Sequence, residues 1–238
     1  MIHPQAETTY INYRFIFKDG SEEYVPVKLN LKDLSFISGK SKMDEKWTAL
    51  TYHQCQNCQL RSEDHPYCPI AFNLTGIIPK FRNFKSFEKV LIRVETPERV
   101  YEKETTLQQA LGSLLGIIMV TSGCPTMLIL KPMTRFHLPF ATVEETVYRA
   151  VSTYLLGQYI RKKKGKKPDW ELNKLAYAYE EIQTVNMGIT DRLRSISKED
   201  ANANAVVVLD VFAKVLPSSI FVELKELEYL FQDLINFD

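Results

Sequence analysis

The chain has 238 residues, of which 45% are hydrophobic and 25% charged, and its formal net charge is +1. These are ordinary values for a globular protein, and the length is enough to bury a substantial core in one large domain or two small ones. The near-neutral charge offers no general attraction for nucleic acid or for an anionic membrane surface. The longest apolar run, residues 114–120, is far shorter than the roughly 20 residues of a membrane span.

The amino terminus does not resemble a secretion signal, because it has no basic region followed by an apolar stretch. We therefore expect a cytoplasmic protein without a membrane partner. Disulfides are rare in that compartment, so clustered cysteines favour metal or redox chemistry over structural bridges.

The amino-terminal part of the chain has the residue pattern of β-strands. Aromatic residues alternate with other side chains over residues 13–18, which predicts a half-buried strand. Asp19 and Gly20 then supply a strong signal for a hairpin turn. Residues 24–29 predict a second strand, and Pro26 places that strand at an edge because proline cannot donate to a strand ladder.

Three more segments of this part are predicted to be extended. A third strand is expected at residues 47–52, where it leads into a polar loop over residues 54–69. Residues 87–95 alternate again and predict a further strand, and residues 100–103 predict a short strand that pairs back on it as a hairpin.

From about residue 105 the hydrophobic period becomes helical. Apolar residues at steps of three and four predict a helix that begins at Thr105 or Thr106 and ends at Gly123. A capping box at residues 142–145 predicts the start of the next helix. Three more helices are expected, from residue 168 to about 194, at about 198–215 and at about 218–235, with Pro217 between the last two.

The order of strands first and helices afterwards indicates an α+β fold rather than alternating βα units. We expect an N-terminal antiparallel β-sheet with a cysteine-rich loop, followed by a C-terminal bundle of about five helices. The β-rich part would cover residues 1–104 and the helical part residues 105–238, packed as one compact unit that a metal site staples together.

The four cysteines are the strongest functional signal in the sequence. Cys55 and Cys58 have the two-residue spacing that lets both sulfurs reach one ion from a tight turn. Cys68 and Cys124 complete the four thiolates of a tetrahedral site, and His53 is a candidate to replace or support one of them. We therefore expect a metal-binding protein of unknown biological role, with a structural site.

The identity of the metal stays open between two ions. Zinc fits a closed structural site of four thiolates. A 4Fe-4S cluster also takes four cysteines, and the prolines that follow Cys68 and Cys124 are a feature of cluster proteins. The cysteine spacing matches neither standard ferredoxin pattern. Zinc is thus the expected cofactor and the cluster is the alternative, with the absence of any metal as a third interpretation.

Two other functions are weighed against metal binding. An enzyme or small-molecule site could form at Arg135, His137 and Glu144, where Arg135 could bind an anion and His137 could transfer a proton. The basic run at residues 161–167 could bind nucleic acid, but it lacks interleaved aromatic residues. A solvated loop explains the basic run more simply, so a nucleic-acid partner is not expected. Whether the protein is an enzyme stays open.

Four sequence blocks carry a resemblance to known proteins. They are HQCQNC at residues 53–58, TSGCP at 121–125, PMTRFHLPF at 132–140 and YLLGQY at 154–159. Together they resemble a family of uncharacterised bacterial cytosolic proteins, a domain of unknown function, over most of the chain. The resemblance implies bacterial origin and a cytosolic location, and it implies no activity and no catalytic residue.

Overall fold

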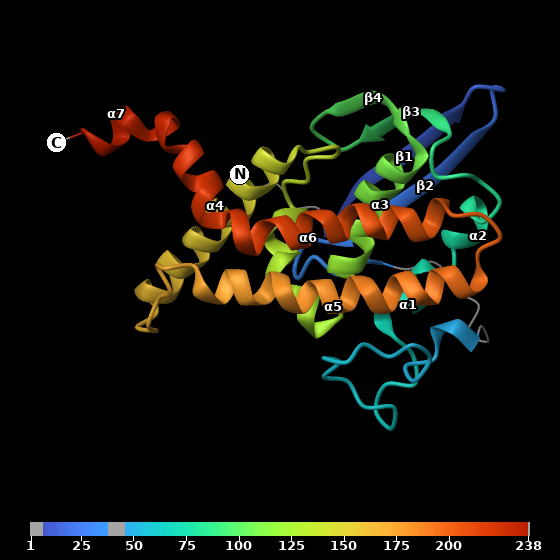
Figure 1. Ribbon diagram of the computed structural model, residues 1–238, viewed down its shortest axis with the longest axis horizontal. Coiled ribbons are helices and arrows are strands. Elements are labelled where there is room, and N and C mark those ends of the chain that lie inside the picture. The colour runs from blue at the N-terminus through green and yellow to red at the C-terminus, as the bar shows by residue number, and fades with distance from the viewer. Residues whose placement is uncertain (1–6, 38–45, 238) are drawn as a thin grey trace.

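A four-stranded antiparallel sheet holds the amino-terminal strands (Figure 1). The computed structural model describes residues 7–37 and 46–237, with only the backbone described over 215–223. Residues 1–6, on which the expectation of no secretion signal rests, lie outside the described residues. The strands are β1 (Thr8–Phe17), β2 (Glu22–Asn30), β3 (Lys89–Glu95) and β4 (Val100–Thr106), in the order β2-β1-β3-β4.

The sheet confirms the alternation seen in the sequence. Tyr13, Phe15 and Phe17 are buried on one face of β1, while the residues between them are more exposed. Such alternation is the signature of a sheet with one face on the core and one face toward solvent. The strand that contains Pro26 lies at the edge, as predicted, and β3 and β4 form the expected hairpin.

The predicted strand at residues 47–52 is wrong. The chain forms a 3-10 turn, η1 (Lys46–Thr48), and then a single bridge between Ala49 and Tyr67. The physical reason is a buried arginine of α5 (Asn173–Ile196). Arg192 is 1% exposed and donates to the carbonyl groups of Trp47, Ala49 and Leu50 at 2.6, 2.8 and 2.9 Å. A side chain therefore satisfies backbone groups that a neighbouring strand would otherwise bind.

The first long helix, α3 (Leu107–Thr121), confirms the predicted helix and lies in the core between the sheet and α6 (Ala201–Glu226). It ends before Gly123, whose φ of +97° is a conformation that glycine adopts without strain. Two glycines let α6 approach α3 closely. A Cβ atom at Gly112 would lie 3.2 Å from the Ala205 carbonyl oxygen, and one at Gly116 would lie 3.3 Å from a Leu209 methyl group.

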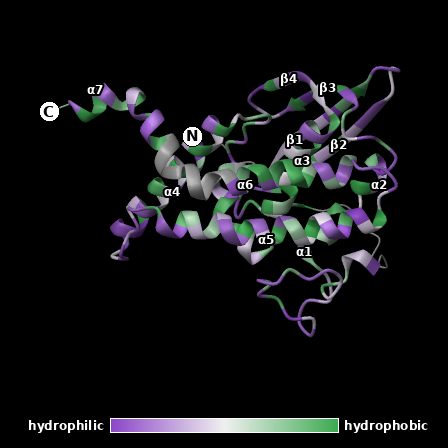
Figure 2. Cartoon of the chain, viewed as in Figure 1, coloured by the Kyte–Doolittle hydropathy of each residue, from purple (hydrophilic) through white to green (hydrophobic). Residues whose placement is uncertain are grey.

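The remaining helices cover α3 and extend the chain beyond it. The short helices α1 (Pro69–Leu74) and α2 (Ile78–Phe81) precede β3. The 3-10 segment η2 (Pro125–Thr134) follows α3, and α4 (Val143–Lys163) begins with the predicted capping box. α5 and α6 run side by side in opposite directions (Figure 1), and α5 alternates between hydrophilic and hydrophobic bands (Figure 2). The chain ends with η3 (Glu228–Phe231) and α7 (Gln232–Ile235).

Two predictions about the last helices need correction. The helix predicted from residue 168 begins later, because Leu172 precedes α5 in a left-handed conformation with φ of 60°. The predicted break at Pro217 is also wrong, since α6 runs unbroken through this residue. A proline removes one helical hydrogen bond, and a long helix packed along a partner can tolerate that loss. The α+β class is confirmed, with an antiparallel sheet followed by helices.

None of the described helices is by itself both long and apolar enough to cross a membrane. The segments α3 and η2 reach that composition only together, and they are bent by 116° at the break between them.

The buried arginine yields the first prediction. Replacing Arg192 by methionine should lower the free energy of unfolding by about 3 kcal/mol, because three buried carbonyl groups lose their charged donor. Urea denaturation would measure the change. Arg194→Met is the matched control on the same helix, since the Arg194 side chain is 62% exposed, and it should change stability by no more than about 0.5 kcal/mol. Equal stability of the two variants would contradict the role of Arg192.

Candidate functional site

The four cysteines, which come from three separate segments of the chain, lie near one another in the folded protein. Cys58, Cys68 and Cys124 are each close enough to Cys55 for their charges to raise its pKa. Cys68 and Cys58 act on Cys124 in the same way. All four are free thiols; Cys68 is buried and the other three are half-buried. The fold thus brings together the residues that the sequence singled out.

Short turns and helix starts hold these residues. The backbone N–H of Cys58 donates to the Cys55 carbonyl at 3.0 Å, which closes a turn. The N–H of Cys68 donates to the Thr48 carbonyl at 2.8 Å. Cys68 directly precedes α1 and Cys124 directly precedes η2, each followed by the proline that opens its helix. These backbone bonds set the positions of the thiols without a disulfide.

Helix α5 forms the surface on which the Cys55 segment rests. A Cβ atom at Gly188 would lie 2.7 Å from the Cys55 sulfur and 3.4 Å from the His53 carbonyl oxygen. Only glycine allows so close an approach of the loop to the helix. Seven residues earlier, the Glu181 carbonyl accepts a hydrogen bond of 2.8 Å from the Asn57 amide. Residues before and after Cys55 are therefore fixed to the same helix.

The electrostatics of the group oppose thiolates when no cation is present. Burial, followed by repulsion from Cys68, raises the pKa of Cys55 to about 12. Burial is also the main cause that raises the pKa of Cys124 to about 11, while the backbone N–H groups of Met127 and Thr126 act on this thiol in the opposite direction. Hydrogen bonds from N–H groups favour a thiolate over a thiol.

The thiols share one region but do not form a ready coordination shell. Within residues 7–37 and 46–237, no three His, Cys, Asp or Glu side chains are arranged so that they could hold a metal ion as they stand. His53, the candidate additional ligand, is exposed, and its ring packs edge-on against Tyr52 with the ring centres 4.7 Å apart. The prediction that these residues bind a metal stays a prediction.

A second polar cluster surrounds His137. Its Nε2 atom lies 2.6 Å from the Tyr13 hydroxyl and 3.3 Å from the Ser113 hydroxyl, and these two hydroxyls are 3.2 Å apart. Burial, followed by the charge of Arg149, lowers the pKa of His137 to about 3. The imidazole is therefore neutral at physiological pH and can accept or donate a hydrogen bond.

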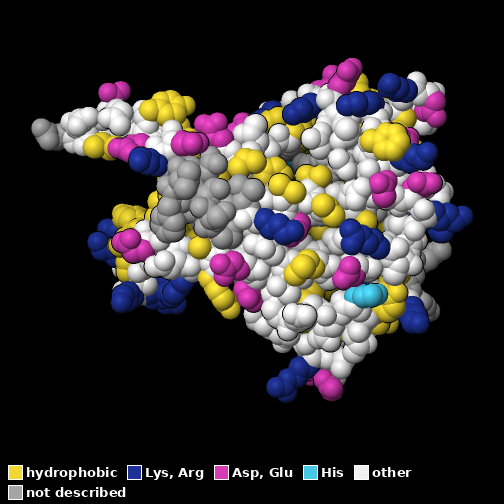
Figure 3. All heavy atoms as spheres, viewed as in Figure 1, with side chains coloured by type: hydrophobic (Ala, Val, Ile, Leu, Met, Phe, Trp, Pro, Cys, Tyr) yellow, Lys and Arg dark blue, Asp and Glu magenta, His cyan; other side chains and the backbone are white. Residues whose placement is uncertain are grey.

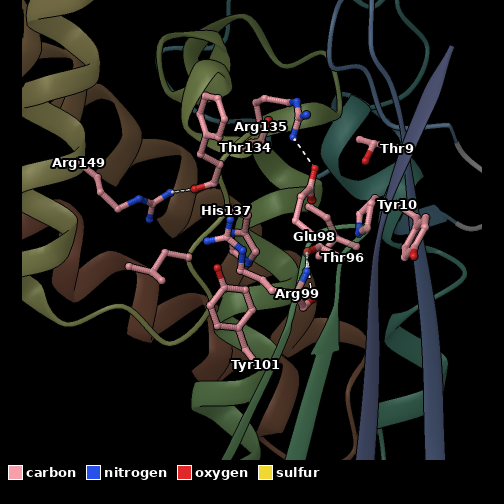
Figure 4. Close-up of a pocket in the computed structure, with 14 residues that line it drawn as sticks. Thr9, Tyr10, Thr96, Glu98, Arg99, Tyr101, Thr134, Arg135, His137 and Arg149 are labelled. Carbon is pink, nitrogen blue, oxygen red and sulfur yellow. Dashed lines mark hydrogen bonds and ion pairs between the residues drawn. The ribbon is translucent and has the colours of Figure 1, made fainter. Parts of the chain in front are cut away.

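Of the other two candidate residues of this region, Arg135 lies beside the same cavity as His137, and Glu144 lies apart from both. Arg135 and His137 both line a cavity of about 280 Å³, and Arg135 forms an exposed ion pair with Glu98 at 3.6 Å (Figure 4). Glu144 is exposed at the start of α4 and lines neither described cavity.

Sequence reasoning missed three residues here. Tyr13 fits the alternation of a core strand, and Ser113 and Arg149 belong to helical patterns without any motif. No local signal distinguishes them, because their proximity arises only when β1, α3 and α4 meet the segment that carries His137.

The basic run at residues 161–167 is exposed at the carboxyl end of α4, where Figure 3 shows Lys and Arg side chains gathered at one corner of the molecule. Cations at this end of a helix are favoured by the helix dipole, which accounts for part of the run without any ligand. Nucleic-acid binding through this run stays untested.

The depressed pKa of His137 predicts a pH dependence of stability. The folded protein keeps His137 neutral down to about pH 3, whereas the unfolded chain takes up a proton below about pH 6.5. The contribution of His137 to the free energy of unfolding is therefore fully present above pH 6.5 and is lost as the pH falls toward 3. The loss is at most about 1.4 kcal/mol per pH unit.

Urea denaturation of His137→Asn at pH 7, 6 and 5 would test this expectation. The variant should lose less stability on acidification than the native protein. His65→Asn, which changes an exposed histidine, should keep the native pH dependence. Equal slopes for the native protein and His137→Asn would show that burial does not hold the imidazole neutral.

Comparisons with known proteins give one match. A family model described as "Domain of unknown function (DUF6901)" matches residues 11–232, which covers all four cysteines, His137 and every strand except the start of β1. No curated protein and no solved structure matches the chain. Because the family model spans most of the sequence, the chain belongs to the DUF6901 family, a domain of unknown function.

Proposed function

We propose that the protein binds one metal centre through Cys55, Cys58, Cys68 and Cys124, with zinc as the first candidate and a structural role. The observation that carries the proposal is that Cys124, which is far away in the sequence, lies near the three free thiols of the loop at residues 54–69. A buried cysteine by itself is only a small hydrophobic residue. Four that meet at one place supply the ligand number and type of a closed zinc site.

The charges near the thiols support this proposal. Thiolates that repel one another in a half-buried region are unfavourable without a cation, and a bound metal ion reverses that preference because it is itself the largest local charge. The guanidinium of Arg192 acts on Cys55 in the favourable direction, although more weakly than burial opposes it. N–H groups at Cys124 would further stabilise a metal-bound sulfur.

Binding would require the thiols to close on the ion. Three of the four are half-buried and reside in turns or at helix starts, so small movements of side chains and of the loop could complete the shell. The cysteine-rich loop at residues 54–69 would then be joined both to the end of α3 and to α5. In such sites the binding free energy contributes directly to folding. A cytoplasmic location, which belongs to the same proposal, would keep the thiols reduced.

Metal content is the direct test. Protein purified without oxygen should contain about one zinc per chain and show no visible colour, whereas a brown absorbance with iron and sulfide would favour the 4Fe-4S alternative. Cys58→Ser should lower both the metal content and the melting temperature. Gln56→Ser is a matched control because it changes an exposed residue of the same loop. Metal-free native protein together with equal melting temperatures for the two variants would contradict the proposal.

Gly188 offers a second test that leaves every cysteine in place. In Gly188→Ala the new methyl group would lie 2.7 Å from the Cys55 sulfur and would push the loop from α5. We expect a loss of stability of about 2 kcal/mol and weaker zinc retention against a chelator. Gly157→Ala on α4 is the control, since nothing lies within 4 Å of its added Cβ atom, and it should be neutral or slightly stabilising. Unchanged zinc retention in Gly188→Ala would show that metal binding does not depend on the contact between α5 and the Cys55 loop.

A further inference from the structure

A second cavity, of about 470 Å³, lies between α3, η2, α4, α5 and α6. This volume falls within the range of small-molecule sites, which are mostly apolar with a few placed polar groups. Most of the wall is apolar and includes Ile117, Val120, Met127, Leu130, Phe140 and Leu209. None of the four cysteines lines this cavity, so it is a separate site from the proposed metal centre.

Asn186 is an unpaired polar group in this wall. It lies on α5, is 2% exposed and lines the cavity, yet its amide nitrogen has no hydrogen-bond partner in the described structure. Leaving a buried amide unpaired costs about 1–3 kcal/mol. Buried groups of this kind are rare in native proteins and call for an explanation. A ligand oxygen that enters the cavity would supply the missing acceptor.

Arg149 is the second polar feature, and Figure 4 shows it reaching from α4 toward the segment with His137. Its Nη2 atom donates to the carbonyl groups of Met133 and Phe136, each at 3.1 Å. Among the described residues no carboxylate forms an ion pair with it, although burial already disfavours its charge. The Glu145 carboxylate favours this charge but forms no ion pair with it, so an anion in the cavity would be its direct partner.

The charges around the cavity all have one sign. The ionisable residues that line it include Arg149 and the exposed Lys103, and no Asp or Glu lines it. His137 contributes no charge because its imidazole is neutral at physiological pH. The cavity therefore favours an anionic ligand over a neutral or cationic one.

The spacing of the two polar features indicates the length of the ligand. Arg149 and Tyr179 both line the cavity. Tyr179 and Asn186 share one face of α5 and are seven residues apart, or roughly 10 Å along the helix axis. An extended chain of about ten carbon atoms has a similar length.

We propose that this cavity binds a medium-chain carboxylic acid with a second oxygen near its far end, a hydroxyl or a carbonyl. The carboxylate meets Arg149, the chain lies against the apolar wall, and the distal oxygen meets the Asn186 amide. Burial of the chain supplies most of the affinity, while the two polar contacts select the ligand.

Calorimetric titration with three probes tests the proposal. The probes are 10-hydroxydecanoate, decanoate, which lacks the hydroxyl, and 1,10-decanediol, which lacks the carboxylate. The native protein should bind the hydroxy acid at one saturable site, and each of the other two about tenfold more weakly. No saturable binding of the hydroxy acid, or equal binding of all three probes, would overturn the proposal.

Two variants test which residues contact the carboxylate and the distal oxygen of the ligand. Arg149→Met should weaken both acids about tenfold and leave the diol unchanged, whereas Arg135→Met, which removes an arginine outside this cavity, should leave all three unchanged. Asn186→Leu should weaken the hydroxy acid but not decanoate, and should raise the melting temperature of the ligand-free protein because it removes an unpaired buried amide. If Arg149→Met affects binding no more than Arg135→Met, or Asn186→Leu leaves hydroxy-acid binding intact, the proposed ligand contacts are wrong.

Discussion

The three hydrogen bonds from the buried guanidinium of Arg192 are the interaction on which the rest of the architecture depends. They attach residues 47–50 to α5, and the same segment receives the N–H of Cys68 through the Thr48 carbonyl. A planar guanidinium can donate to several carbonyl groups at fixed angles, which an ammonium group cannot do as well. One cation in the core therefore joins the segment before the cysteine loop to α5, where Gly188 and Glu181 contact the loop itself.

Two faces of helix α5 contact different parts of the structure. Residues 181, 188 and 192 follow helical spacing on one face. Residues 181 and 188 contact the loop with Cys55, and the guanidinium of residue 192 binds the backbone of residues 47–50. Residues 179, 182 and 186 follow the same spacing on another face and line the large cavity. Because an α-helix turns once every 3.6 residues, a single rigid element can serve both regions.

Local patterns predicted the four strands of the sheet and the helices α3 and α4, because each depends on neighbouring residues. Alternation set the buried face of β1, Pro26 placed β2 at the edge, and the capping box placed the start of α4. The prediction failed at residues 47–52, where apolar residues suggested a strand. There a side chain 142 residues or more along the chain took the backbone hydrogen bonds that a strand would need. The unbroken α6 at Pro217 is another case in which tertiary packing prevailed over a local rule.

The sequence by itself determined the α+β class, with strands before the long helices, and the four cysteines as the residues to follow, since composition, period and spacing are local properties. Only the tertiary structure decided that Cys124 lies near the other three and that Arg135 and His137 share a cavity from which Glu144 is absent. It also decided that Arg149, which donates to two carbonyl groups, and Asn186, whose amide nitrogen has no hydrogen-bond partner, line one cavity. Contacts of this kind depend on how helices and strands that are far apart in the sequence pack together. The spacing of residues along the chain does not specify that packing.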